Sequence, residues 1–188
     1  MIGGNLPNIS FETFYVSKEE PNNELIPEIV RIGKKLKELK IIKESDGIIS
    51  LSFGKRVLIN GYVEDISNIK RKELFEIVDY DPVKNNLLII GSIEPRLETP
   101  VHWMIHHART DVNAAIQINN VELVEKVKNK IPETDKDYLT GSFDQIKDVL
   151  RLLRDNKKLI TKNQSIIFVG NTIKEVEKDI IKTFEESK

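Results

Sequence analysis

Two β-rich runs joined by a glycine-containing turn occupy the middle of the sequence. Gly47–Phe53 is followed by Gly54-Lys55 and then by Arg56–Ile59. A short turn between two β-prone runs predicts a hairpin, so the sheet is not expected to be wholly parallel. Further strands are expected at Leu74–Val78, Leu87–Ile90, Ala114–Ile118 and Ile166–Val169, with a turn over Asp79–Asn86.

Four helices are expected around these strands. Apolar residues within Leu25–Leu39 recur at spacings of three and four, and Pro27 suits a first helical turn. A second helix should run to Arg109, with Thr99 as its cap and Pro100 at its first position. The last two helices follow capping-box patterns, Ser142 with Gln145 and Thr172 with Glu175. Hairpin strands flanked by helices predict an α/β layered domain with a mixed or antiparallel sheet.

The bulk composition is that of one globular domain spanning residues 1–188, with 1–21 as an irregular or strand-like lead. Lys plus Arg (29) nearly balance Asp plus Glu (30), so the net charge gives no overall electrostatic attraction to nucleic acid or to an anionic membrane. The runs Lys70-Arg71-Lys72 and Lys157-Lys158 are interpreted as solvated surface. There is no cysteine, no apolar run of membrane-spanning length and no signal-peptide pattern at Met1–Asn5, so we expect a cytoplasmic protein.

Four segments, in this order, resemble the class II aldolase/adducin family. They are Gly47-Ile48-Ile49-Ser50 with its following strand, Leu97-Glu98-Thr99-Pro100-Val101-His102, Arg109-Thr110-Asp111-Val112-Asn113-Ala114, and Asn163-Gln164-Ser165 with its following strand. The resemblance covers about residues 24–186, although the segment 119–141 looks abbreviated. It implies a three-layer α/β/α sandwich around a mixed, mostly antiparallel central sheet. It also implies a homo-oligomer, a tetramer or a dimer.

The zinc ligands that the resemblance implies are replaced. In the family, a His-x-His pair and a third histidine bind Zn²⁺; the corresponding positions here are Gln117, Asn119 and Gln164. A neutral carboxamide oxygen is a poor ligand for zinc, which prefers imidazole and thiolate. We therefore expect no cofactor, with zinc or another divalent metal only if the site has been rebuilt. The family's phosphate-binding positions fall on Ile48, Asn60–Val63 and Arg96-Leu97, which lack the expected hydroxyls.

Glu98 lies at the family's catalytic acid/base position, where a carboxylate in a pocket can transfer protons. Alternatively, Glu98 has no catalytic role, and its negative charge only interacts favourably with the positive end of the helix dipole beside it. Arg96 could contact an anion or be an exposed surface arginine. His102 and His106, four apart on one helix, have a spacing that can chelate zinc, but a packing or hydrogen-bonded role is the alternative. Trp103 is interpreted as core or subunit interface rather than a stacking platform.

Three functions remain open at this point. The first is a non-catalytic binding or scaffold module with a small-molecule or protein ligand. The second is a divergent enzyme, related to aldolases, epimerases or dehydratases, that uses Glu98 on a small carbonyl or sugar-like substrate. The third is an ordinary zinc aldolase, which the three carboxamides disfavour. A polar, open cavity beside Glu98 would favour an enzyme, whereas a space filled by Ile48, Tyr62 and Leu97 would favour a scaffold.

Overall fold

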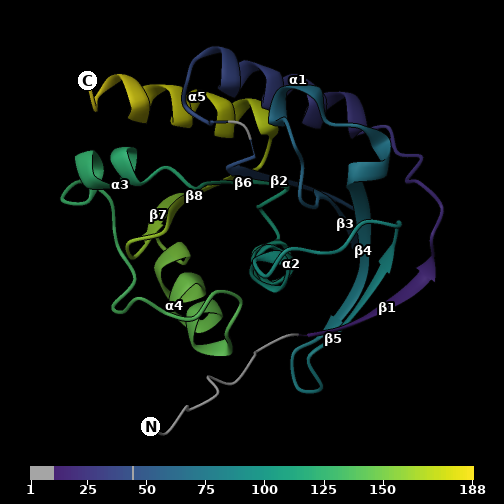
Figure 1. The fold of residues 1–188 in the computed structure, drawn as a ribbon. Coiled ribbons are helices and arrows are strands. Elements are labelled where there is room, and N and C mark those ends of the chain that lie inside the picture. Colours follow the sequence, from purple (N-terminus) through teal and green to yellow (C-terminus); the bar gives the residue numbers. More distant parts are fainter. Residues whose placement is uncertain (1–10, 44) are drawn as a thin grey trace, which may run out of the picture.

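The computed structural model describes residues 11–43 and 45–188. In this part of the chain, eight strands form one sheet between two layers of helices (Figure 1). The strands are β1 (Glu12–Ser17), β2 (Gly47–Phe53), β3 (Arg56–Asn60), β4 (Leu74–Asp81), β5 (Asn86–Ile90), β6 (Ala114–Ile118), β7 (Lys158–Thr161) and β8 (Ser165–Gly170). The helices are α1 (Ile26–Glu38), α2 (Thr99–Ala108), α3 (Val121–Val127), α4 (Phe143–Leu153) and α5 (Ile173–Glu185), with two 3₁₀ turns at Ile66–Asn68 and Arg71–Glu73.

The sheet is mixed and mostly antiparallel, as the resemblance implied. Its strand order is β1-β5-β4-β3-β2-β6-β8-β7, and only the β1–β5 pair among these strands is parallel. The helices α1 and α5 cover one face, while α2 and α4 lie on the other (Figure 1). This arrangement confirms the predicted three-layer α/β/α class.

Alternation along β6 assigns its side chains to the two layers. Ile116 and Ile118 belong to the core under α1 and α5, whereas Ala115 belongs to the core under α2 and α4. Because successive strand residues point to opposite faces, Gln117 faces the α2 layer with Ala115. The same alternation places Ser50 of β2, which pairs with Ala115, on this face. The polar residues of the candidate site therefore gather beneath α2.

Most predicted elements lie where the sequence placed them. The hairpin of β2 and β3 and the strand β6 are confirmed, and Pro27 lies in the first turn of α1. β4 continues to Asp81, so the predicted turn begins only after that residue. Within the lead 1–21, residues 12–17 form β1; the predictions for residues 1–10, including the absence of a signal-peptide pattern at Met1–Asn5, lie outside the described residues.

The predictions for Thr99 and Lys158 need correction, and two elements were not predicted. The prediction of Thr99 as a cap is wrong: Thr99 is the first residue of α2, Glu98 is at the N-cap position, and Glu98 makes no side-chain capping bond. Thr99 Oγ1 is buried and has no hydrogen-bond partner in the described part of the chain. In addition, β7 and α3 are elements that the sequence did not predict. Lys158, predicted to be solvated, is half-buried at the start of β7 and pairs with Asp179.

Candidate functional site

Gln117 and Asn119, at the end of β6, lie side by side. Gln117 Nε2 donates to Asn119 Oδ1 at 3.3 Å, and Gln117 Oε1 lies 3.3 Å from Nε2 of His102. Gln117 is buried and Asn119 is half-buried. The Gln117 carboxamide thus connects the end of β6 to helix α2.

Gln164 makes its contacts elsewhere. It precedes β8, and its side-chain nitrogen donates to Asp137 Oδ1 at 2.7 Å and to the Tyr138 carbonyl at 2.9 Å. Its side-chain oxygen accepts from Thr140 Oγ1 at 3.4 Å and from Gln145 Nε2 at 3.3 Å. Both donor hydrogens and both acceptor sites of the carboxamide are therefore used. Gln164 fastens the segment before α4 to the start of β8.

The three positions that the resemblance assigns to the metal do not offer a zinc-binding donor set. Gln117 bonds with Asn119, but none of the side-chain bonds of Gln164 reaches either of them. All three donors are neutral carboxamides, and those of Gln117 and Gln164 are already held by protein groups. Zinc prefers imidazole, thiolate and carboxylate ligands. The residues present do not fit this metal.

His102 and His106 are joined by a serine that the sequence analysis did not single out. Ser50 Oγ lies 2.7 Å from His102 Nδ1 and 2.8 Å from His106 Nε2. His106 Nδ1 lies 3.2 Å from the Val112 carbonyl oxygen. Ser50 Oγ also lies 3.4 Å from the Ala115 carbonyl oxygen, and its one hydrogen can be donated to only one of these three groups. A polar serine within the apolar run of β2 was the sequence signal for this cluster.

Both histidines are neutral at pH 7. Burial lowers the pKa of His102 to about 3, with the nearby His106 and Arg96 acting in the same direction. Burial also lowers the pKa of His106 to about 4, against the opposing effect of its hydrogen bonds. Within residues 11–43 and 45–188, no three His, Cys, Asp or Glu side chains are grouped so that they could hold a metal ion. Both imidazoles are hydrogen-bonded in this structure.

Arg96 and Glu98 form a second polar group just before α2. Arg96 Nε lies 3.5 Å from Glu98 Oε2, and the guanidinium lies 4.8 Å from the centre of the Tyr62 ring. The Arg96 side chain is 8% exposed and that of Glu98 14%. The alternative of an exposed surface arginine is therefore wrong. Arg96 Nε is buried and has no hydrogen-bond partner among the described residues, and its 3.5 Å ion pair with Glu98 offsets part of that cost.

A glycine turns the chain toward this group. Gly91, directly after β5, has φ +145°, and a Cβ there would lie 2.6 Å from Phe75 Cβ. Only glycine adopts this backbone without strain and without displacing Phe75. The turn leads into residues 92–98, which carry Arg96 and Glu98 to the start of α2.

The positions that correspond to the family's phosphate site have other roles. Ile48 is fully buried in the core with Trp103, whereas Tyr62 and Leu97 are exposed. Asn60 is buried and bonds to the backbone of Gly47, Ile49 and Gly61. Ile48, Tyr62 and Leu97 therefore do not jointly fill a space beside Glu98, and Asn60 stabilises the end of the hairpin.

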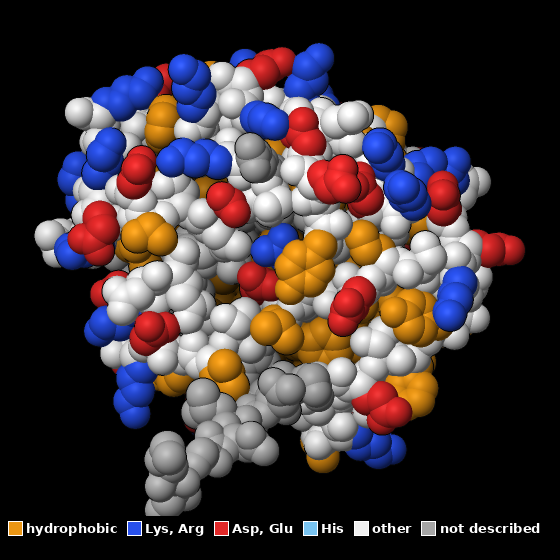
Figure 2. Space-filling view, viewed as in Figure 1, with side chains coloured by type: hydrophobic (Ala, Val, Ile, Leu, Met, Phe, Trp, Pro, Cys, Tyr) orange, Lys and Arg blue, Asp and Glu red, His pale blue; other side chains and the backbone are white. Residues whose placement is uncertain are grey.

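The remaining residues from the sequence analysis have structural positions. Trp103 is buried and stacks on His107 with ring centres 3.6 Å apart, which confirms the interpretation as core. Lys70-Arg71-Lys72 are exposed, as predicted. Basic and acidic side chains are interspersed over the face that Figure 2 shows, and hydrophobic side chains gather near its centre and lower right. No helix in the described part of the chain is long and apolar enough to cross a membrane.

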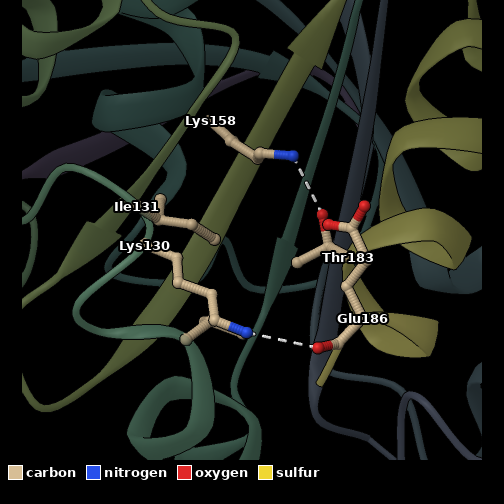
Figure 3. Close-up of a pocket in the computed structure, with 6 residues that line it drawn as sticks. Lys130, Ile131, Lys158, Thr183 and Glu186 are labelled. Atoms are coloured by element: carbon tan, nitrogen blue, oxygen red, sulfur yellow. Dashed lines mark hydrogen bonds between the residues drawn. The ribbon is translucent and has the colours of Figure 1, made fainter. Parts of the chain in front are cut away.

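A small cavity of about 110 Å³ lies away from this site, between α3, β7 and the end of α5 (Figure 3). Lys158 Nζ donates to Thr183 Oγ1 at 3.0 Å, and Lys130 Nζ donates to the Glu186 carbonyl at 3.3 Å. Both ammonium groups therefore have protein acceptors. Its lining residues include none of those at the positions that the resemblance assigns to the aldolase site.

Comparison with known proteins agrees with this fold and this motif order. The family described as Class II Aldolase and Adducin N-terminal domain matches residues 27–124, and the chain belongs to this family. A search of curated protein sequences found no match.

Solved structures show the same fold at low sequence identity. An L-fuculose 1-phosphate aldolase is 16% identical with a TM-score of 0.72, over 89% of this chain and 84% of that one. A sugar-phosphate aldolase from Thermotoga maritima is 12% identical with a TM-score of 0.70, over 87% and 92%. The N-terminal class II aldolase domain of a Thermoplasma acidophilum protein is 12% identical with a TM-score of 0.64, over 92% and 96%.

Proposed function

We propose that this chain is a family member without a working zinc aldolase site and that it acts as a non-catalytic binding or scaffold module. One observation carries this proposal: the carboxamides of Gln117 and Gln164 are engaged in hydrogen bonds that hold the fold together. A zinc ion would have to displace those bonds and accept neutral oxygen ligands in return. In this proposal, Gln117 and Gln164 stabilise the fold instead of binding a metal.

The first experiment is elemental analysis of untagged protein purified without added metal, followed by calorimetric titration with Zn²⁺, Mn²⁺ and Co²⁺. We expect no stoichiometric metal and no binding tighter than about 100 μM, or about −5.5 kcal/mol. Stoichiometric metal would overturn the proposal. In that case His102→Ala and His106→Ala would test whether the buried histidines supply a rebuilt site.

The ion pair of Arg96 and Glu98 supports a second candidate, a divergent enzyme acting on a small carbonyl or sugar-like substrate. Glu98 keeps part of its surface accessible, and Arg96 offers a buried positive charge that could meet an anionic group of a ligand. A carboxylate in this setting can act as an acid or base. The outward-facing Tyr62 ring lies over the same guanidinium and would bound the ligand on one side.

The two candidates are separated by an assay of aldol cleavage, epimerisation and dehydration on a panel of small aldehydes, ketones and sugar phosphates. An enzyme that uses Glu98 would lose about a hundredfold or more in rate in Glu98→Gln. Glu94→Gln, which changes an exposed glutamate of the same segment, is the matched control. No turnover by the wild type would exclude this candidate for the panel tested.

We also propose, from family membership, that the chain forms a homo-oligomer, without nucleic-acid or membrane partners, and that it is cytoplasmic. The described surface in Figure 2 mixes both signs of charge, which favours neither nucleic acid nor anionic lipid. Sedimentation at micromolar concentration tests the oligomer, and a monomer throughout would refute it.

A further inference from the structure

The sequence contains one Asn-Gly pair, Asn60-Gly61, at the end of β3. An asparagine before glycine is the asparagine most prone to lose its side-chain amide, because glycine has no Cβ to hinder attack by its own backbone nitrogen. In the folded chain both residues are buried, and Asn60 is 0% exposed. The most reactive asparagine of the chain therefore lies in its interior.

Three hydrogen bonds hold the Asn60 carboxamide. Its oxygen accepts from the Ile49 amide at 2.7 Å, and its nitrogen donates to the carbonyls of Gly47 at 3.1 Å and Gly61 at 3.0 Å. Both side-chain hydrogens and the oxygen are thus engaged. The side chain joins the start of β2 to the end of β3, and it cannot turn toward the Gly61 nitrogen without breaking these bonds.

The nitrogen that would attack the carboxamide is engaged as well. The Gly61 amide donates to the Glu73 carbonyl at 2.9 Å, next to the pairing of Asn60 with Leu74. A Cβ at Gly61 would lie 3.0 Å from the Glu94 carbonyl oxygen, so backbone packs closely around this residue. Ring closure needs a free Gly61 amide and an Asn60 side chain rotated toward it. The folded hairpin meets neither condition.

We propose that Asn60 is a site of spontaneous deamidation, which folding suppresses and which opening of β3 permits. The Gly61 nitrogen attacks Cγ of Asn60 and forms a new C–N bond. The bond from Cγ to the side-chain nitrogen breaks, and ammonia leaves with the hydrogen that the Gly61 amide loses. Water then opens the succinimide ring at either carbonyl and leaves an aspartate or an isoaspartate at position 60. The inference does not depend on whether the Glu98 site is catalytic.

Either product is incompatible with the end of the hairpin. A carboxylate has no hydrogen to donate, so it cannot bond to the carbonyls of Gly47 and Gly61, and it brings a buried negative charge toward both. An isoaspartate adds a carbon to the backbone and shifts the register of β3 against β4. A chain that reacts while it is open therefore cannot close into the same structure, and its unfolding becomes irreversible.

Deamidation is measured by peptide mapping and mass spectrometry of the full chain, in mildly alkaline buffer and in denaturing urea. Asn129, which is exposed and precedes a lysine, is the internal reference. In urea Asn60 should react at least about tenfold faster than Asn129, and in buffer at least about a hundredfold slower than in urea. Reaction of Asn60 in buffer at its urea rate, or no preference for Asn60 in urea, would overturn the proposal.

A strained hairpin turn should speed the reaction. Gly54→Ala strains the turn between β2 and β3 and leaves the Asn60-Gly61 pair unchanged. In buffer this variant should lose the Asn60 amide about fivefold faster than the wild type, and in urea the two rates should be equal. Lys55→Ala, at an exposed position of the same turn, is the matched control and should react as the wild type does. Equal rates for Gly54→Ala and the wild type in buffer would reject control of the reaction by the hairpin.

The irreversibility is tested with the product. The fraction of wild-type chains that refold on dilution from urea should fall in step with the unreacted fraction of Asn60. Asn60→Asp, which carries the carboxylate, should lower the urea midpoint or fail to fold. Asn129→Asp makes the same change at an exposed position and should keep the wild-type midpoint. An Asn60→Asp chain as stable as the wild type would contradict the proposed irreversibility.

Discussion

At the scale of single residues, the buried cluster of Ser50, His102 and His106 links stability to pH. Both imidazoles are neutral in the folded chain because burial lowers each pKa well below 6.5. The unfolded chain takes up these two protons near pH 6.5, whereas the folded chain does so only near pH 3 to 4. Stability from this source is fully present above pH 6.5 and is lost as the pH falls toward 4.

We therefore expect the free energy of unfolding to fall by up to about 1.4 kcal/mol per pH unit for each histidine between pH 6 and pH 4. Urea denaturation at several pH values measures this slope. His106→Gln removes one of these two titrating groups and should lower the slope by the contribution of one proton. The pKa of Asp65 is lowered to about 2, first of all by its hydrogen bond with Lys37, so its contribution is lost only below this window.

Gln164 provides a second residue-scale prediction. Replacement by alanine removes the bonds to Asp137, Tyr138, Thr140 and Gln145 and should destabilise the chain by about 1–3 kcal/mol. Hydrogen exchange should increase in residues 137–145. Gln164→Glu keeps the shape but brings a carboxylate to Asp137, so it should be no better than alanine. Unchanged exchange in both variants would contradict the fastening role.

At the scale of elements, the segment before α4 depends on a close approach between backbones. Gly141 has φ +77°, and a Cβ there would lie 2.2 Å from the Leu97 carbonyl oxygen. Its amide also donates to the side chain of Gln145. The segment therefore packs directly on the residue that precedes Glu98. Any displacement of the segment would be transmitted to the start of α2.

Gly54 offers a matched control for this contact. Gly54 has φ +57° in the hairpin turn, with nothing within 4 Å of an added Cβ. Gly54→Ala should cost about 1 kcal/mol from backbone strain alone. Gly141→Ala should cost about 1–3 kcal/mol more, because the new methyl group meets backbone. Equal midpoints in urea for the two variants would show that residues 139–142 move away freely.

The sequence was sufficient for elements with strong local signals. Ser142 and Thr172 cap α4 and α5 as predicted, and the hairpin turn falls at Gly54. β7 was missed because four residues carry little pattern, and that strand is defined by its pairing with β8. The partners of Gln164 could not be predicted because they lie 19 to 27 positions away in the chain. Polar contacts between residues far apart in the chain do not produce a repeating pattern in the sequence.

At the scale of the whole molecule, three buried hydrophobic clusters on the two faces of one sheet hold the chain together. The first lies under α1 and α5, the second under α2 and α4, and the third contains Ile48, Phe75 and Trp103. None of them contains a position that the resemblance assigns to the metal. The folded state is therefore not expected to depend on a bound ion.

This independence predicts the effect of chelation. An ion that binds only the folded state raises stability by RT ln(1 + [L]/Kd), and removing it lowers the midpoint of unfolding. Treatment of freshly purified protein with EDTA should leave the thermal midpoint unchanged within about 1 °C. A clear drop that zinc reverses would contradict both this prediction and the proposed loss of the metal site.

The two ends of the sheet differ in how the edge strand is protected. The segment 132–134 bonds to Ile160 and so covers the edge of β7. A covered edge strand has its backbone groups already paired, so the sheet cannot be extended by a further strand beyond β7.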